Sequence, residues 1–66
     1  MKAVIKIELG NEAFGNTSAE RLFEMQNVME RLVDRAGQIM AVDAGDFVTA
    51  QDVNGNTVAR MDIVDE

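Results

Sequence analysis

The side chains of this chain that could take part in chemistry are almost all carboxylates. The sequence holds 12 acidic and 6 basic residues, and it has neither histidine nor cysteine. Acyl transfer of the triad type needs an imidazole or an equivalent base beside the nucleophile, and zinc sites draw mainly on Cys and His. Neither kind of site can be assembled here, so we predict that the protein is not an enzyme and needs no cofactor.

Two groups of carboxylates stand in turn-like segments. Asp43 and Asp46 are the closest pair and could in principle do acid and base work, but Asp43-Ala44-Gly45-Asp46 is typical of a solvated turn. The segment Asp52-Val53-Asn54-Gly55-Asn56 resembles the start of a calcium loop, yet its glycine comes one residue early and Ile63 takes the place of the bidentate Glu. We therefore expect no metal site.

The acidic balance of the chain disfavours direct binding to nucleic acid. The formal net charge is −6, whereas affinity for phosphate backbones comes from Lys and Arg that displace counterions. Such charge can serve solubility alone. Alternatively, an acid-rich helix face could mimic phosphate charge and block a basic nucleic-acid-binding host protein. The carboxylates of this predicted partner-binding face are Glu20, Glu24, Glu30 and Asp34.

Phe23 interrupts the polar side of the same helix. It lies about 100° round from Leu22, in the sector of Asn27, Glu30 and Asp34. It either packs under the loop 11–16, against Phe14, or acts as an aromatic anchor for a partner, since exposed aromatic residues ringed by polar groups are typical of binding hot spots. Both interpretations are kept open.

One long helix is predicted from Thr17 to about Gly37. Thr17 and Glu20 have the spacing of a capping box, and Gly37 suits the left-handed residue beyond a helix end, so we place that end between residues 36 and 40. An apolar stripe with helical spacing should lie on a sheet. Its members are Leu22, Met25, Met29, Leu32, Val33 and Ala36, flanked by Val28.

Three strands are predicted around this helix, at residues 2–9, 47–53 and 56–64. The first alternates apolar and polar residues and carries Lys2 and Lys6 on its outer face, which is typical of a sheet edge. The last two are joined through Asn54-Gly55, a strong hairpin signal. We predict an α+β fold of order β-α-β-β, in which one helix covers an antiparallel sheet of spatial order one, three, two and Phe14 covers one end of the core.

The register of this hairpin has two solutions. A two-residue turn places Val48 and Ala50 on the inner face and leaves Phe47 outside, whereas a three-residue turn turns Phe47 inward and leaves Val48 and Val58 outside. We favour the second, because burying a Phe contributes more than burying a Val.

The closing hairpin also carries a resemblance. Asp52-Val53-Asn54-Gly55-Asn56-Thr57-Val58 is similar to the D-x-N-G-N-x-V-G hairpin of small acidic proteins from bacteriophage and prophage genes, and the order of elements matches over nearly the whole chain. Ala59 stands where that family has glycine. The resemblance implies a phage-type accessory protein and supplies no functional residues.

These observations lead to a functional expectation. We predict a single domain, residues 1–66, that acts in the cytoplasm as a non-enzymatic interaction protein, binding and inhibiting a host protein without contact with membranes or nucleic acid. So small a domain gains from self-association, and Val4 and Val58 on the uncovered sheet face are the predicted contacts of a homodimer. The alternative is a structural subunit of a larger phage particle or complex.

Overall fold

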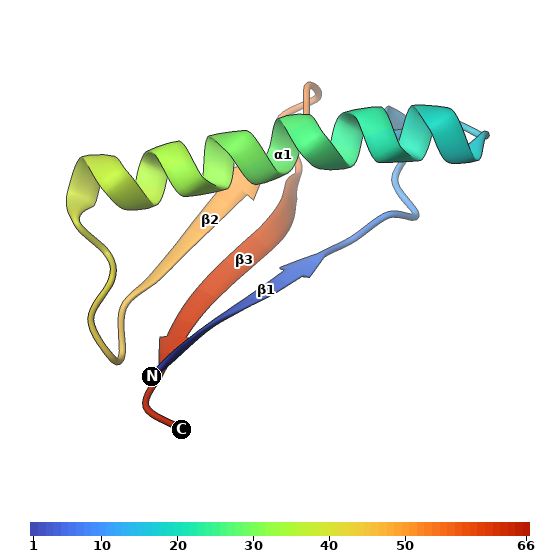
Figure 1. The fold of residues 1–66 in the computed structure, drawn as a ribbon. Helices are drawn as coiled ribbons and strands as arrows, with labels where there is room; N and C mark the ends of the chain where they lie inside the picture. The colour runs from blue at the N-terminus through green and yellow to red at the C-terminus, as the bar shows by residue number, and fades with distance from the viewer.

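A computed structural model describes residues 1–66, and it has the predicted α+β architecture. The three strands form one antiparallel sheet in the order β1-β3-β2, and α1 lies across one face of that sheet (Figure 1). The elements are β1 (Lys2–Ile7), the 3-10 helix η1 (Glu12–Phe14), α1 (Ser18–Ile39), β2 (Phe47–Gln51) and β3 (Thr57–Val64). The predicted edge position of β1 and the central position of β3 are confirmed.

The start of α1 follows the capping prediction in part. The Thr17 hydroxyl accepts a hydrogen bond from the Glu20 amide at 3.1 Å, which satisfies one free donor of the first turn, but the Glu20 side chain makes no return bond. At the other end, Met40 adopts the left-handed conformation with φ 55° and donates its amide to Ala36. The helix ends at Ile39, within the predicted range of residues 36 to 40, but Gly37 lies inside the helix and Met40 takes the left-handed position instead.

Phe14 covers one end of the core, as predicted. It sits in η1, whose first residues are held by the Asn11 side chain, which accepts from the Ala13 amide at 3.0 Å. Gly15 follows with φ 71°, a conformation that favours glycine. The Phe14 side chain is fully buried, so the loop before α1 acts as a plug for the core.

The hairpin adopts the register that we did not favour. Val48 lies opposite Met61 and Ala50 opposite Ala59, which leaves Phe47 on the outer face. A bulge follows, because Gln51 pairs with Thr57 and Val58 becomes an extra residue in β3. Extra backbone at this point lets the consecutive residues Val58 and Ala59 both enter the core.

The single helix covers only part of the sheet. α1 lies against β2 and β3, and β1 has no comparable contact with it. A helix is about 10 Å wide and strands lie about 4.8 Å apart, so one helix spans roughly two strands. The buried apolar residues are Phe14, Val28, Leu32, Ala36, Ala41, Val48, Ala50, Val58, Ala59, Met61 and Ile63.

Candidate protein-interaction surface

The rotation of α1 about its axis leaves much of its apolar stripe exposed. Val28, Leu32 and Ala36 are four residues apart and form the buried line on the sheet. By contrast, Leu22 is 52% exposed and Val33 is 53% exposed. Only part of the stripe that was predicted to lie on the sheet is therefore buried, because the stripe is wider than the contact that the sheet offers.

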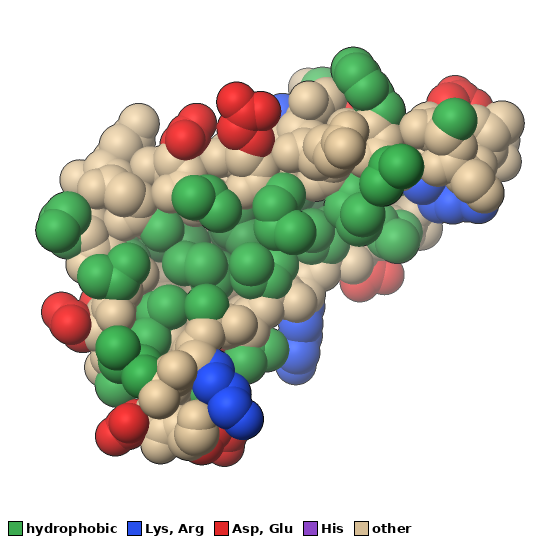
Figure 2. All heavy atoms as spheres, viewed as in Figure 1, with side chains coloured by type: hydrophobic (Ala, Val, Ile, Leu, Met, Phe, Trp, Pro, Cys, Tyr) green, Lys and Arg blue, Asp and Glu red, His purple; other side chains and the backbone are tan.

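The exposed flank of the helix joins with β1 to form one apolar surface. Ile5 and Ile7 lie opposite the buried Met61 and Ala59 and so face the core side of the sheet, yet they are only partly buried. Figure 2 shows hydrophobic side chains gathered between α1 and the sheet on this side. We call this surface the β1-side apolar face; it comprises Ile5, Ile7, Leu22, Met25, Met29 and Val33.

The backbone of β1 adds a free edge to this surface. The Glu8 amide donates to the Val58 carbonyl at 2.7 Å, so Glu8 and the residues that alternate with it direct their backbone groups towards β3. The backbone groups of Ala3, Ile5 and Ile7 consequently point away from β3, and β1 is the outermost strand on this side. An apolar face and an unpaired strand edge thus lie next to each other.

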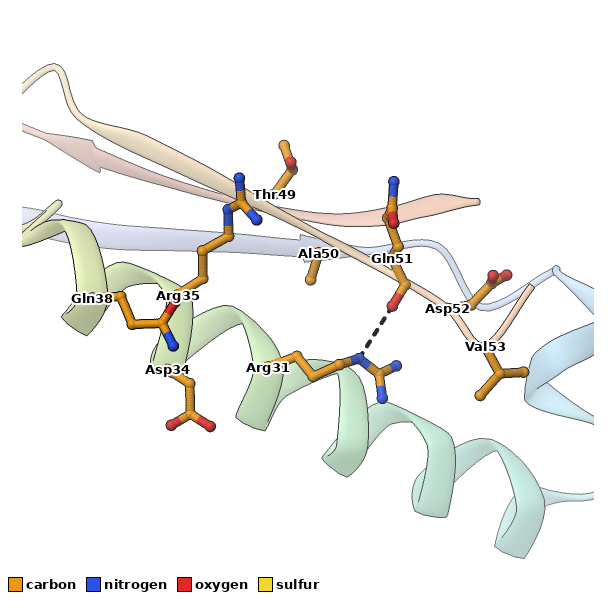
Figure 3. A pocket seen from close by; sticks show the side chains of 9 residues that line it. All are labelled: Arg31, Asp34, Arg35, Gln38, Thr49, Ala50, Gln51, Asp52 and Val53. Atoms are coloured by element: carbon orange, nitrogen blue, oxygen red, sulfur yellow. Dashed lines mark hydrogen bonds between the residues drawn. The ribbon is translucent and has the colours of Figure 1, made fainter. Parts of the chain in front are cut away.

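The other edge of the sheet is occupied by polar side chains. The Arg31 Nε donates to the Gln51 carbonyl at 3.2 Å, which satisfies an outward-pointing backbone group of β2 (Figure 3). Arg35 and Gln38 also reach into the shallow pocket between α1 and β2. The β2 edge is therefore partly blocked by the helix's own side chains.

Arg31 also forms an ion pair with Glu24. The Arg31 Nη2 lies 3.3 Å from the Glu24 Oε1, and Glu24 is buried. Its prediction as part of an exposed acidic face was wrong, because the pair spans two helical turns on the flank that faces β2. Glu20, Glu30 and Asp34 remain exposed.

Phe23 lies on the side of α1 that faces away from the sheet. It is 67% exposed, so the interpretation that it packs against the buried Phe14 was wrong. The ring is an apolar group among polar neighbours, and its use as a partner anchor stays a prediction.

The outer sheet face differs from its prediction at one of two residues. Val4 is on this face and exposed, but Val58 is buried because of the bulge in β3, and it cannot serve as a partner contact. The exposed Phe47 lies under the Arg60 guanidinium, 4.1 Å from the ring centroid. Arg60 in turn donates to Asp62, which lowers the pKa of that carboxyl and raises the pKa of Arg60.

The Asp52 carboxylate is used to build the hairpin turn. Its Oδ1 accepts from the Asn54 amide at 2.8 Å and from the Asn56 amide at 3.0 Å. Burial raises the pKa of Asp52, but these hydrogen bonds lower it by more, so it lies below the ordinary value. The Asp46 side chain similarly accepts from the Asp43 amide, and no group of three or more acidic residues is placed to hold a metal ion.

Sequence reasoning missed the β1-side apolar face, although a signal for it was present. The apolar arc of the helix includes seven residues, and a single helix cannot cover three strands. A sheet flank must then stay open on one side.

No protein-family model, curated protein or solved structure matches this chain. No helix here has the length and apolar character that crossing a membrane requires.

Proposed function

We propose that the protein is a non-enzymatic binding module whose interaction surface is the β1-side apolar face together with the free edge of β1. One observation carries the proposal: Ile5 and Ile7 face the core side of the sheet but are not fully covered, and their backbone groups lie at an unpaired edge. Contiguous exposed apolar patches often mark protein interaction sites. Strand addition to a free edge supplies main-chain hydrogen bonds to a partner.

Photo-crosslinking tests this proposal even while the partner is unidentified. A photoreactive phenylalanine is placed at Val33, in the β1-side apolar face, and in a matched variant at Gln38, which is also exposed but lies on the β2 flank of α1. Illumination in producing cells should give a defined adduct from position 33 and none from position 38. Absence of an adduct at position 33, or equal labelling at both positions, would contradict the proposed surface.

The outward side of α1 offers a second candidate site, favoured by the exposure of Phe23. The ring is 67% exposed, and Glu20 and Glu30 on the same helix are exposed carboxylates. We propose that a basic protein partner would bind here, with the ring as anchor and the carboxylates as its counter-charges. Binding of such a partner should weaken steeply between about 0.05 and 0.5 M salt; an affinity that is independent of salt would remove this second site.

A further inference from the structure

We propose that the β1-side apolar face is occupied by a second copy of this chain, through antiparallel pairing of the two β1 strands with Ile5 on the two-fold axis. The inference rests on the proposed function and names the partner of that surface. Such a dimer would join two three-stranded sheets into one sheet of six strands, which is within the usual size range.

The directions of the backbone groups restrict how β1 can pair with itself. Ala3, Ile5 and Ile7 carry the free amides and carbonyls, and their side chains all face the core side of the sheet. Paired residues of antiparallel strands project to the same side. Registers that place these three residues opposite one another therefore keep both helices on the same face and bring the two open apolar faces together.

Charge then selects among those registers. With Ile5 on the axis, Lys2 of each copy lies opposite Glu8 of the other, so the dimer contains two opposite-charge pairs. With Val4 on the axis, Lys2 would lie opposite Lys6 twice, and with Lys6 on the axis two Lys6 side chains would meet. Like charges directly opposite across strands are destabilising, so these two registers are disfavoured.

A further shift, with Ile7 on the axis, also avoids contacts between like charges. It would pair Lys6 with Glu8, but only residues 5–9 would be aligned, and β1 ends at Ile7. The Ile5 register aligns residues 2–8 and so uses all of β1. It also places Ile5 against Ile5 and Ala3 against Ile7 on the inner face.

The helices border the paired strands in this arrangement. Leu22, Met29 and Val33 lie on the flank of α1 opposite the one that faces the β2 edge. In the dimer these flanks would face each other across a groove whose floor is formed by the two β1 strands, which the helices do not cover. Self-association of this kind adds buried apolar surface, which small domains without disulfides or metals need.

Sedimentation equilibrium at low salt tests the inference through charge reversal. The parent should form a species of twice the 7.2 kDa chain mass. Lys2→Glu and Glu8→Lys each place like charges opposite each other twice, and each should raise the dissociation constant about 2- to 30-fold. The double variant Lys2→Glu/Glu8→Lys restores both pairs with reversed polarity and should return the constant to within about two-fold of the parent.

Arg35→Glu is the matched control, because it makes the same change in net charge at an exposed residue on the β2 flank of α1. It should alter the dissociation constant by much less than Lys2→Glu. Circular dichroism melts of all variants establish that each is folded.

Three outcomes would overturn the inference. Tightening by Lys2→Glu would indicate the Val4 register, and a dimer insensitive to both single reversals would use another register or another surface. A parent that stays monomeric up to millimolar concentration would exclude the second copy as the occupant. A photo-adduct of position 33 with a different protein would, in that case, leave the proposed function standing, whereas no adduct would remove both.

Discussion

The two edges of the sheet differ in what the helix presents to them. At the β2 edge, Arg31 reaches across and donates to the outward carbonyl of Gln51, and Arg35 lies beside the strand. At the β1 edge no side chain of α1 makes a comparable contact, and the adjoining surface is apolar. Arg31 already occupies an outward acceptor of the β2 edge, so the β1 edge keeps more free backbone groups for pairing with another strand.

Two flanks of the same helix place the two sheet edges in different environments. The flank of α1 with Arg31 and Arg35 closes one side of the sheet, and the flank with Met29 and Val33 leaves the other side open. Lys2 and Lys6 on the outer face of β1 lie beside its free backbone groups, and they disfavour the pairings that bring like charges opposite each other. They thereby limit the registers in which another strand can pair.

The largest expected effect comes from a helix residue that is fully buried against the sheet. Leu32 is fully buried on the sheet, so Leu32→Asp should cost more than about 4 kcal/mol and unfold the domain. Its neighbour Val33 is exposed on the β1 side, and Val33→Asp should lower the stability of the monomer by less than about 1 kcal/mol. Urea denaturation of both variants at low protein concentration checks this; similar losses would refute the observed rotation of α1.

The next largest effect is expected at Arg31, the helix residue that contacts the β2 edge. Arg31→Met removes the donor to Gln51 and leaves the buried Glu24 carboxylate without its cation. The free energy of unfolding should fall by about 1 to 2 kcal/mol. The double variant Arg31→Met/Glu24→Gln should lose less than the two single variants together, since it buries no unpaired charge. Strict additivity in this double-mutant cycle would show that the ion pair is uncoupled.

Acid should weaken the β2–β3 hairpin in a graded way. The pKa of Asp52 is lowered by hydrogen bonds to its charged form, so its contribution to stability is present above the unfolded-state pKa of about 4 and is lost as the pH falls through the lower folded-state value. Asp62 should contribute with the same sign, because Arg60 lowers its pKa.

Asp52→Asn isolates the contribution of the turn. The amide oxygen can still accept from the Asn54 and Asn56 backbones, but it does not titrate. Urea midpoints measured between pH 2 and pH 5 should therefore depend on pH less steeply in Asp52→Asn than in the parent. An unchanged slope would contradict the assigned role of this carboxylate.

The smallest effect is expected at Phe23, which lies away from both edges. Because the ring is 67% exposed, Phe23→Ala should change the free energy of unfolding by less than about 0.5 kcal/mol. Thermal melts of parent and variant decide this before any partner is known. A loss of about 3 kcal/mol, typical of a buried Phe, would mean that the ring packs in the core.

The architecture was predictable because local signals agreed with one another. Thr17 begins the helix, alternation in β1 and β3 identifies their inner faces, and Asn54-Gly55 lies in the hairpin turn. The bulge at Val58 was not predictable from alternation, since one extra residue shifts the pattern without a signal in the side chains.

The interaction surface was harder to derive than the fold. An apolar stripe predicts that a helix packs on a sheet, but it does not predict the rotation of the helix about its own axis. Glu24 is buried beside Arg31, which lies two turns further along the helix. In the structure the polar flank faces β2 and the surplus apolar residues lie on the β1 side. Only the relative widths of one helix and three strands could have indicated that a flank stays open.

Amide hydrogen exchange of β1, measured by NMR over a range of protein concentrations, tests the central claim that its free edge is the interaction surface. In dilute protein the amides of Ala3, Ile5 and Ile7 should exchange rapidly, while the β1 amides that point to β3 are protected. At concentrations where the dimer forms, these three amides should become protected and those of Phe47 and Thr49 at the β2 edge should not. Persistent rapid exchange at Ile5, or protection that appears at Phe47 and Thr49 instead, would contradict the account.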